Sequence, residues 1–153
     1  MKSVITGGAG FIGSNLAEKL VQLGHKVVVL DNLSTGRLSN LNNIKNKIEF
    51  KNIDISKKDK FFDQYFEKVD WVFHLAGLAD IVPSIDNPTQ YFNSNVKGTL
   101  NILESSRRAN IKKLIYAASA SCYGIPDKYP TNENSKIDPQ YPYALTKFIG
   151  EQL

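Results

Sequence analysis

Short apolar runs alternate with longer stretches of helical periodicity along the whole chain. The strongest run is KVVVL at residues 26–30, whose unbroken apolar character is typical of a strand buried on both faces. On this pattern we predict strands at residues 3–6, 26–30, 47–50, 70–75 and 113–118. Helical spacing predicts helices at residues 11–23, 57–66 and 88–109, and from residue 141 onward.

Strands of this kind, separated by helices, pair in parallel because each crossover returns the chain to the same end of the sheet. Right-handed crossovers then predict an α/β fold with a doubly wound parallel sheet, Rossmann-like, in the strand order 3-2-1-4-5. Residues 124–140 carry three prolines and little periodicity, which predicts a loop. The last helix has neither a C-cap glycine nor a following proline, so we expect the chain to be truncated before the last strands of such a sheet.

Three glycines stand at every third position of TGGAGFIG (residues 6–13), between the first predicted strand and the first predicted helix. In a turn of this kind one glycine permits the tight turn, another lets the backbone approach a pyrophosphate, and a third lets helix and strand pack closely. The unpaired N–H groups at the helix N-terminus attract an anion. The stretch therefore predicts a dinucleotide-binding turn, with a ligand-free glycine turn as the alternative.

Asp31 strengthens this prediction because it ends the second predicted strand, 21 positions after Gly10. An acidic residue about 20 positions downstream binds the ribose hydroxyls of the adenosine. Its charge would repel a 2′-phosphate, which favours NAD over NADP. Arg37, six residues further on, argues the other way, because a nearby arginine accommodates that phosphate.

Composition indicates the cellular compartment of the protein and excludes several kinds of binding partner. The 153 residues suffice for one domain, and 42% hydrophobic with 22% charged residues is typical of a soluble globular protein. The single Cys122 permits no internal disulfide, which suits a reducing, cytoplasmic compartment. The sequence contains no run of 18 apolar residues, so no membrane-spanning segment is predicted. The net charge of +4 is scattered, so we expect no nucleic-acid partner, and no residue cluster has metal-ligand spacing.

Seven motifs occur together and in order, and they identify a family resemblance. They are TGGAGFIGSNL (6–16), DNLSTGR (31–37), DI (54–55), HLAG (74–77), NVKGT (95–99), AASASCYG (117–124) and YPYALTK (141–147). With them the chain resembles the extended short-chain dehydrogenase/reductase family, and within it the nucleotide-sugar epimerases and dehydratases, above all UDP-glucose 4-epimerase-like enzymes. The resemblance implies that residues 1–153 are an NAD-binding Rossmann domain whose C-terminal substrate domain is absent from this chain.

The resemblance also implies a set of residues that bind NAD. They are Gly7, Gly10, Phe11, Ile12, Gly13, Asp31, Asn32, Ser34, Gly36, Asp54, Ile55, Leu75, Ala76, Gly77, Asn95, Tyr143 and Lys147. Three of them have a structural alternative. Asp54 would otherwise cap a helix that starts near residue 57, Gly77 would only form a turn, and Asn95 would bond backbone inside its helix. The family often has a lysine two residues after the glycine at position 77, where this chain has Ala79.

Ser119, Tyr143 and Lys147 are the predicted catalytic residues. Tyr143 and Lys147 are four positions apart, so they share a helix face, as would any ordinary surface pair. The resemblance makes Tyr143 the base that takes the hydroxyl proton of the sugar, while the ammonium of Lys147 and the positive nicotinamide ring favour its phenolate. It makes Ser119, otherwise a plain loop serine, the bridge between the substrate oxygen and Tyr143. Ser121 is a further predicted substrate contact.

The residues after Ser119 favour one reaction type. In the related dehydratases an Asp and a Glu follow the catalytic hydroxyl residue, whereas this chain has Ala120 and Ser121, which are poor proton donors and acceptors. We therefore expect an isomerase that performs C4 epimerisation of a UDP-hexose through a 4-keto intermediate. The alternatives are an NAD-dependent nucleotide-sugar dehydrogenase, reductase or decarboxylase, or a non-catalytic dinucleotide-binding module. Family members form homodimers through the helices that match residues 88–109 and 141–153.

Six remaining side chains are predicted to be structural. His74 lies in a strand predicted to be buried, where a hydrogen-bonded core histidine is the expected role. Cys122 lacks a histidine at motif spacing and is expected to fill a small buried space. The aromatic residues Phe61, Phe62, Tyr65 and Phe66 are predicted to face the core.

Overall fold

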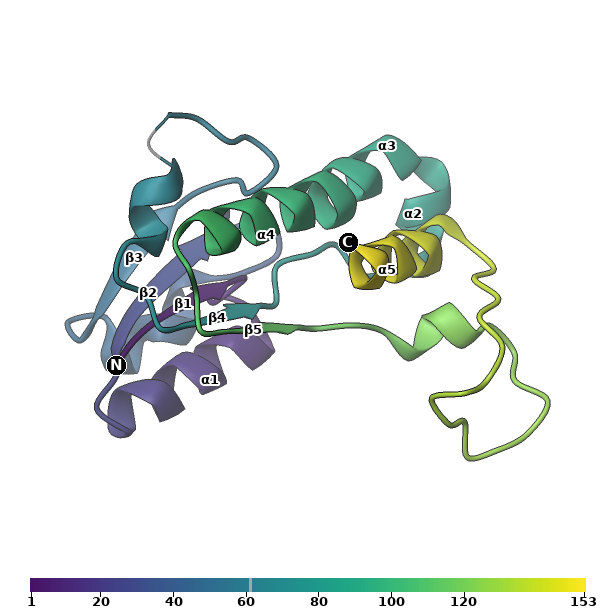
Figure 1. The fold of residues 1–153 in the computed structure, drawn as a ribbon, viewed down its shortest axis with the longest axis horizontal. Helices are drawn as coiled ribbons and strands as arrows, with labels where there is room; N and C mark the ends of the chain where they lie inside the picture. Colours follow the sequence, from purple (N-terminus) through teal and green to yellow (C-terminus); the bar gives the residue numbers. More distant parts are fainter. Residues whose placement is uncertain (61) are drawn as a thin grey trace.

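The structure, a computed structural model, describes residues 1–60 and 62–153, and its centre is one parallel sheet (Figure 1). The strands are β1 (Lys2–Thr6), β2 (Lys26–Asp31), β3 (Ile48–Asn52), β4 (Trp71–His74) and β5 (Lys113–Tyr116). They pair in parallel in the order β3-β2-β1-β4-β5. The predicted doubly wound sheet and its strand order are therefore confirmed.

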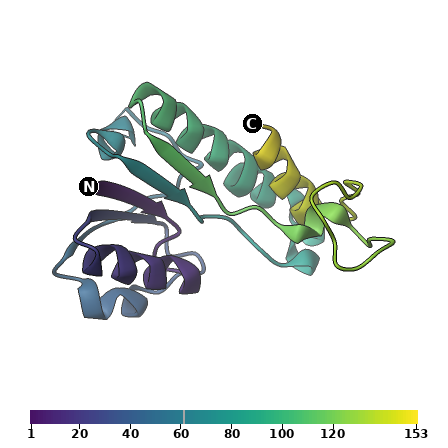
Figure 2. The same ribbon diagram turned by 60° about the horizontal axis from the view of Figure 1, so that its bottom comes forward.

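Helical segments connect the strands and cover both faces of the sheet. They are α1 (Phe11–Gln22), η1 (Leu38–Ile44), η2 (Phe62–Phe66), α2 (Ile81–Asp86), α3 (Pro88–Tyr91), η3 (Phe92–Lys97), α4 (Gly98–Arg108), η4 (Ala120–Tyr123) and α5 (Pro142–Gln152). Figure 2 shows α1 and the blue η1 on one side of the sheet and α4 on the other. The sheet is thus the middle layer of three.

Strand β2 explains why residues 26–30 form an unbroken apolar run. Val27 and Val29 belong to the core cluster on the α1 side, whereas Val28 and Leu30 belong to the cluster on the α4 side. All four are buried. Neither face of this strand meets water, so no position in the run is required to be polar.

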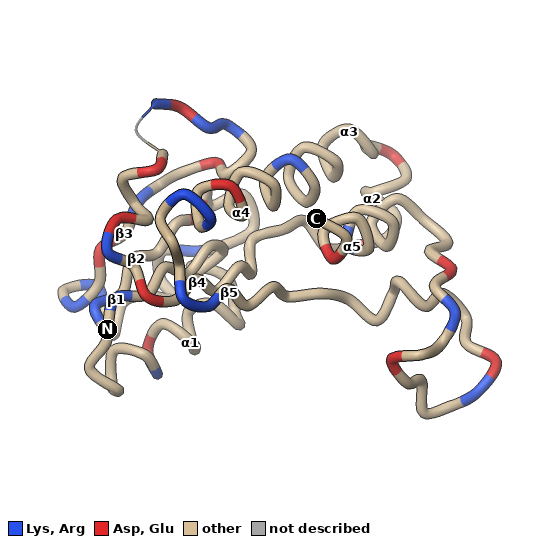
Figure 3. The backbone as a smooth tube through the Cα atoms, viewed as in Figure 1, with Lys and Arg blue, Asp and Glu red and all other residues tan. Residues whose placement is uncertain are grey.

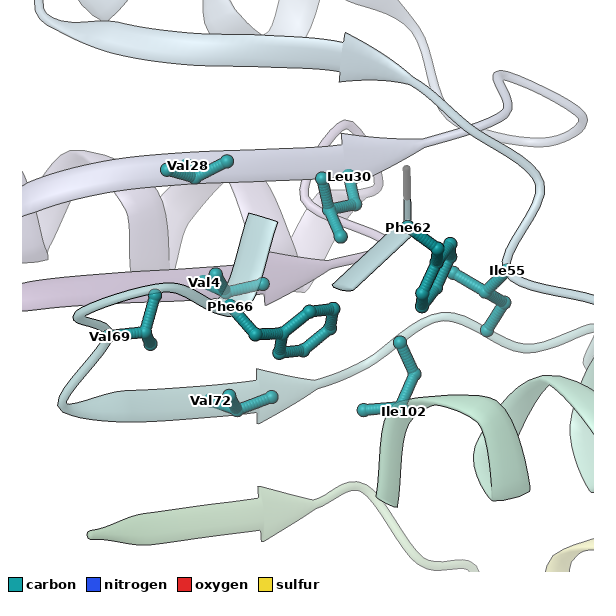
Figure 4. Packing of buried hydrophobic residues seen from close by; sticks show 9 residues of the cluster. All are labelled: Val4, Val28, Leu30, Ile55, Phe62, Phe66, Val69, Val72 and Ile102. Carbon is teal, nitrogen blue, oxygen red and sulfur yellow. The ribbon is translucent and has the colours of Figure 1, made fainter. Parts of the chain in front are cut away.

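The segment between β3 and β4 corrects one prediction. The predicted helix over residues 57–66 is not found: among the described residues of this range, Phe62–Phe66 form the 3-10 segment η2 and residues 57–60 are not helical. Phe62 and Phe66 pack with Val4 and Val72 in the cluster on the α4 side (Figure 4). Their predicted place in the core is therefore confirmed, and burial of the two rings fixes a shorter element than periodicity suggested. Phe61 lies outside the described residues.

The predicted helix over residues 88–109 is present, but it changes type along its length. It begins as α3, continues as the π-helical segment η3 and ends as α4. π-helical turns are rare and are frequent at functional sites. Asn95 lies in this turn.

The carboxyl edge of the sheet has a topological switch point between β1 and β4. The chain leaves β1 toward β2 on one side, while β4 and β5 lie on the other, so the loops after β1 and β4 diverge. Ligands of doubly wound folds bind in the crevice at such a point. The predicted loop 124–140 is confirmed and projects beyond this edge (Figure 1).

Basic and acidic residues are interspersed along the chain (Figure 3). Several of them pair, as in Lys58–Asp63 at 2.7 Å and Lys112–Asp70 at 2.5 Å. In the part of the chain that the structure describes, no helix has the length and apolar character needed to cross a bilayer.

Candidate active site

The turn between β1 and α1 is as tight as its glycines predicted. Gly7 has a φ of +70°, and a Cβ at this position would lie 2.6 Å from the backbone nitrogen of Ala76. A Cβ at Gly13 would lie 2.6 Å from the Cα of Gly8 and would also collide with the carbonyl oxygen of Gly7. One glycine therefore lets the turn approach the end of β4, and the other lets α1 start directly against the turn.

A cleft of about 390 Å³ opens over this turn, at the switch point of the sheet. Fourteen of the residues predicted to bind NAD line it: Gly7, Gly10, Phe11, Ile12, Gly13, Asp31, Asn32, Ser34, Gly36, Asp54, Ile55, Leu75, Ala76 and Gly77. The lining also includes residues that were not among those predicted to bind NAD: Leu30, Thr35, Ile53, Leu78, Ala79, Ser94 and Ala117. The motif residues, separate in sequence, thus form one continuous surface.

Asp31 is held rigidly at the rim of the cleft. Its Oδ2 accepts a hydrogen bond of 2.9 Å from the N–H of Ala9, and its Oδ1 accepts one of 2.8 Å from the N–H of Leu33. The residue is 7% exposed. The carboxylate is therefore oriented before any ligand arrives, and its remaining lone pairs can accept two hydroxyl groups.

Asp54 stabilises a turn and does not cap a helix. Its Oδ1 accepts hydrogen bonds from the N–H of Ser56 at 3.0 Å and from the Oγ of the same residue at 2.7 Å. Burial raises the pKa of this carboxyl, but the bonds from Ser56 and the charge of Lys57 outweigh it and leave the pKa below its usual value. No helix begins near residue 57, so the capping alternative is wrong.

Two of the three predicted catalytic residues, Ser119 and Tyr143, come together just beyond the end of β5. The strand ends at Tyr116, two residues earlier than predicted, and Ser119 is the N-cap residue of η4. The hydroxyl of Tyr143, in the first turn of α5, lies 3.4 Å from the Oγ of Ser119. The Oγ of Ser119 also contacts the Oγ of Ser121 at 2.8 Å. Two residues 24 positions apart in sequence are thus joined by a long hydrogen bond. Catalytic groups often show such long hydrogen bonds before substrate binds.

Tyr143 is fixed partly by a helix that the sequence did not reveal, α2, and partly by two neighbouring tyrosine rings. Its backbone N–H donates to the Oγ of Ser84, which is buried in α2, at 3.2 Å. Its ring lies 6.4 Å from the ring of Tyr141, nearly parallel, and 6.4 Å from that of Tyr91, edge to face. Helix α2 has only six residues, too few for periodicity to predict it.

Lys147 carries a buried ammonium one turn after Tyr143. Burial lowers the pKa of Lys147 to about 8, although Cys122 and Glu151 act in the opposite direction. Its Nζ donates no hydrogen bond to any atom of residues 1–60 and 62–153. A Cβ on Gly77 would lie 3.9 Å from this nitrogen, so the ammonium borders the cleft with its donors unused.

Asn95 lies behind the cleft and uses its whole side-chain amide there. Its Oδ1 accepts from the N–H of Leu78 at 2.8 Å, and its Nδ2 donates to the carbonyl of Leu78 at 2.9 Å and to the Oγ1 of Thr146 at 3.0 Å. It does bond backbone, but across the fold and not within its own helix. Its contact with a cofactor stays a prediction.

His74 is a hydrogen-bonded core residue, as predicted. Its Nδ1 lies 2.6 Å from the Oγ1 of Thr6 and its Nε2 lies 2.9 Å from the Oγ1 of Thr99. Thr99 donates to the carbonyl of Asn95, which leaves its oxygen to accept from Nε2–H and assigns the neutral tautomer. Burial, with the charge of Lys147, lowers the pKa of His74 to about 3, so this histidine stays neutral.

Cys122 is a buried filler, also as predicted. It is 1% exposed, and its Sγ donates toward the carbonyl of Ala144 at 3.6 Å. Burial raises the pKa of the thiol, and the nearby Glu151 adds to this effect. A protonated thiol is a poor nucleophile.

Comparison with known proteins agrees with this geometry. The model of the NAD dependent epimerase/dehydratase family matches residues 3–153. A putative UDP-glucose 4-epimerase of Methanocaldococcus jannaschii is 43% identical over 97% of this chain and 48% of its own length. A UDP-glucose 4-epimerase of Mycolicibacterium smegmatis is 40% identical over 99% of this chain and 49% of its own length. The chain thus spans about half the length of the curated relatives it matches.

Solved structures show the same fold. The UDP-N-acetylglucosamine 4-epimerase of Methanobrevibacter ruminantium superposes with a TM-score of 0.93 at 34% identity, over 99% of this chain and 48% of that one. The UDP-glucose 4-epimerase of Brucella ovis, solved in complex with NAD, superposes with a TM-score of 0.88 at 33% identity, over 99% and 46%. On its sequence match and its fold, the chain belongs to the NAD dependent epimerase/dehydratase family.

Proposed function

We propose that this chain is the cofactor-binding and reactive part of an NAD-dependent nucleotide-sugar epimerase. One arrangement carries the proposal. The hydroxyl of Tyr143 lies 3.4 Å from the Oγ of Ser119, and the ammonium of Lys147, with its hydrogen-bond donors unused, borders the glycine-lined cleft at Gly77. The chain spans about half of its relatives, so we further propose that a substrate domain binding most of the UDP group lies outside these 153 residues.

The residues of the cleft fit NAD. The glycine turn and the N-terminus of α1 offer backbone N–H groups to a pyrophosphate, and the Asp31 carboxylate offers acceptors to the adenosine ribose. Lys147 offers the donors that a second ribose needs. Bound NAD would supply a hydride acceptor that returns the hydride in the same cycle. The charge of Asp31 favours NAD over NADP.

The protein groups proposed for proton transfer are Tyr143 and Ser119. The phenol oxygen of Tyr143 takes the proton of the sugar C4 hydroxyl, and Ser119 passes it on or holds the sugar oxygen. Lys147, one helical turn after Tyr143 on α5, is the residue proposed to assist this transfer with its positive charge. Ser121, bonded to Ser119 at 2.8 Å, is the further proposed sugar contact.

Ala120 and Ser121 favour epimerisation over dehydration, since neither is suited to expelling a hydroxyl group from the sugar. The proposed substrate class is a UDP-hexose, consistent with the UDP-sugar epimerases among the relatives. A dehydrogenase, reductase or decarboxylase on the same scaffold is the second candidate, favoured by the same three catalytic residues. The single, buried thiol of Cys122 supports a reducing, cytoplasmic location.

The test joins cofactor titration with product analysis. Calorimetry on this chain is expected to show NAD binding more tightly than NADP. A version extended by the substrate domain, given UDP-glucose or UDP-N-acetylglucosamine, is expected to invert C4 by NMR without net NADH. Tyr143→Phe is expected to slow inversion by about 10³-fold while NAD still binds.

Three results would contradict the proposal in different ways. Net NADH without C4 inversion would favour the dehydrogenase alternative. NAD binding without any turnover in the extended version would favour a non-catalytic module. An unchanged rate in Tyr143→Phe would remove Tyr143 from proton transfer.

We also propose a homodimer through residues 88–109 and 141–153, which include the helical segments α3, η3, α4 and α5. Of these, α3, η3 and α5 present an apolar hollow of about 550 Å³ that includes Phe92, Leu145 and Ile149. Phe92 is 50% exposed and Leu145 is 47% exposed. Leu145→Asp is expected to turn a dimer into a monomer in sedimentation experiments, because it would bury a charge in an apolar interface. Ile125→Asp, in the projecting loop, is the matched control, and a monomeric wild type would overturn the proposal.

A further inference from the structure

The ammonium of Lys147 has an aromatic neighbour that the proposed chemistry does not use. Its Nζ lies 4.3 Å from the centroid of the Tyr116 ring, at the end of β5. A lysine ammonium within about 6 Å of a ring centroid is attracted by the negative face of the ring. In the described part of the chain this ring takes the place of a hydrogen-bond acceptor for the ammonium.

The Tyr116 ring is itself held in place from several sides. Its centroid lies 5.5 Å from that of the His74 ring, and its hydroxyl donates to the backbone carbonyl of Lys147 at 3.4 Å. Burial is the main reason why the pKa of Tyr116 is raised to about 12. The phenol therefore stays neutral, and Tyr116 is not a second base beside Tyr143.

Gly150 makes room for this ring. A Cβ at Gly150 would lie 2.8 Å from the Cζ of Tyr116 and would collide with its hydroxyl oxygen. Gly150 and Lys147 are three positions apart on α5, so they share a face of the helix. The missing side chain lets the ring lie under the helix, directly below the ammonium.

We propose that Tyr116 is a positioning residue for Lys147, whose ring face holds the buried ammonium beside Gly77 at the edge of the cleft. Its consequence for cofactor binding rests on the proposed function. Lys147 would then bind the ribose of NAD without first breaking a hydrogen bond to a protein atom. The ring face carries this role, and the hydroxyl does not.

Two substitutions separate the ring from the hydroxyl. Tyr116→Phe keeps the ring, whereas Tyr116→Leu removes it, and Tyr129→Leu in the exposed loop is the control. In NMR spectra of the chain without cofactor, the ε-methylene protons of Lys147 are expected upfield in the wild type and in Tyr116→Phe, but not in Tyr116→Leu. The Kd for NAD is expected to rise about tenfold in Tyr116→Leu alone, the size of a partly desolvated cation–π contact.

A second pair of variants covers the case in which Tyr116→Leu does not fold. Gly150→Ala is expected to displace the ring and reduce the upfield shift, and adding Tyr116→Phe is expected to restore part of it. The proposal is overturned if Tyr116→Leu or Gly150→Ala keeps the wild-type shift, or if Tyr116→Phe loses it. A wild type that shows the shift but binds no NAD would overturn the proposed function and leave the positioning role standing.

Discussion

Gly13→Ala is expected to weaken NAD binding by about two orders of magnitude and to lower the free energy of unfolding by about 3 kcal/mol. The added Cβ would lie 2.6 Å from the Cα of Gly8 and against the carbonyl of Gly7, and neither is a side chain that can rotate away. Helix α1 would have to move off the turn that is proposed to bind the pyrophosphate. Calorimetric titration with NAD and urea unfolding measure the two effects.

Gly24→Asn is the matched control for this experiment. Gly24 has a positive φ of +80°, but a Cβ there meets nothing within 4 Å, and asparagine tolerates this backbone conformation. Affinity for NAD is expected to stay at the wild-type value. If Gly13→Ala bound NAD normally with unchanged stability, the close contact of α1 with the turn would not be what organises the cleft.

Lys147→Met is expected to make the chain more stable at pH 7, by up to about 3 kcal/mol, while it weakens NAD binding. The pKa of Lys147 lies near 8 in the folded chain and near its ordinary 10.5 in the unfolded chain. Below pH 8 both states carry the charge, and the folded state bears the full penalty of burying it. Between pH 8 and 10.5 the unfolded state holds more protons, so the wild type gains stability as the pH rises.

The stability difference between wild type and Lys147→Met should therefore be largest below pH 8 and should vanish above about pH 10.5. Urea unfolding of both proteins at a series of pH values measures it, and other titrations cancel in the difference. Lys19→Met, an exposed position on α1, is expected to show no such pH dependence. A variant less stable than the wild type at every pH would mean that the ammonium is not desolvated.

A buried ammonium that destabilises the fold needs another reason to be there. Functional sites commonly retain groups that a stability-optimised core would not contain. In this chain the ammonium of Lys147 lies beside Gly77 at the cleft, one helical turn after Tyr143. The charge lowers the stability of the folded chain, as is expected where a buried group is kept for binding a ligand.

Sequence was sufficient where the physical requirement is local. The glycine spacing in residues 6–13, with Asp31 at the end of the next strand, located the cleft, because a turn of that tightness admits only glycine. The apolar run at residues 26–30 predicted a sheet covered by helices on both faces, because a strand that lacks polar positions is buried on both faces. The one helix predicted too long, at residues 57–66, failed because the core side chains Phe62 and Phe66 override local periodicity.

The chain by itself thus determined the parallel sheet, its strand order, the glycine turn and the family, all of which follow from short-range patterns. Only the tertiary structure decided how Lys147 is surrounded. Tyr116 lies 31 positions away in sequence, and Ser84, which anchors Tyr143, lies on a helix too short to predict. Burial, ring contacts and unused hydrogen-bond donors depend on which elements pack together, and no local pattern encodes that.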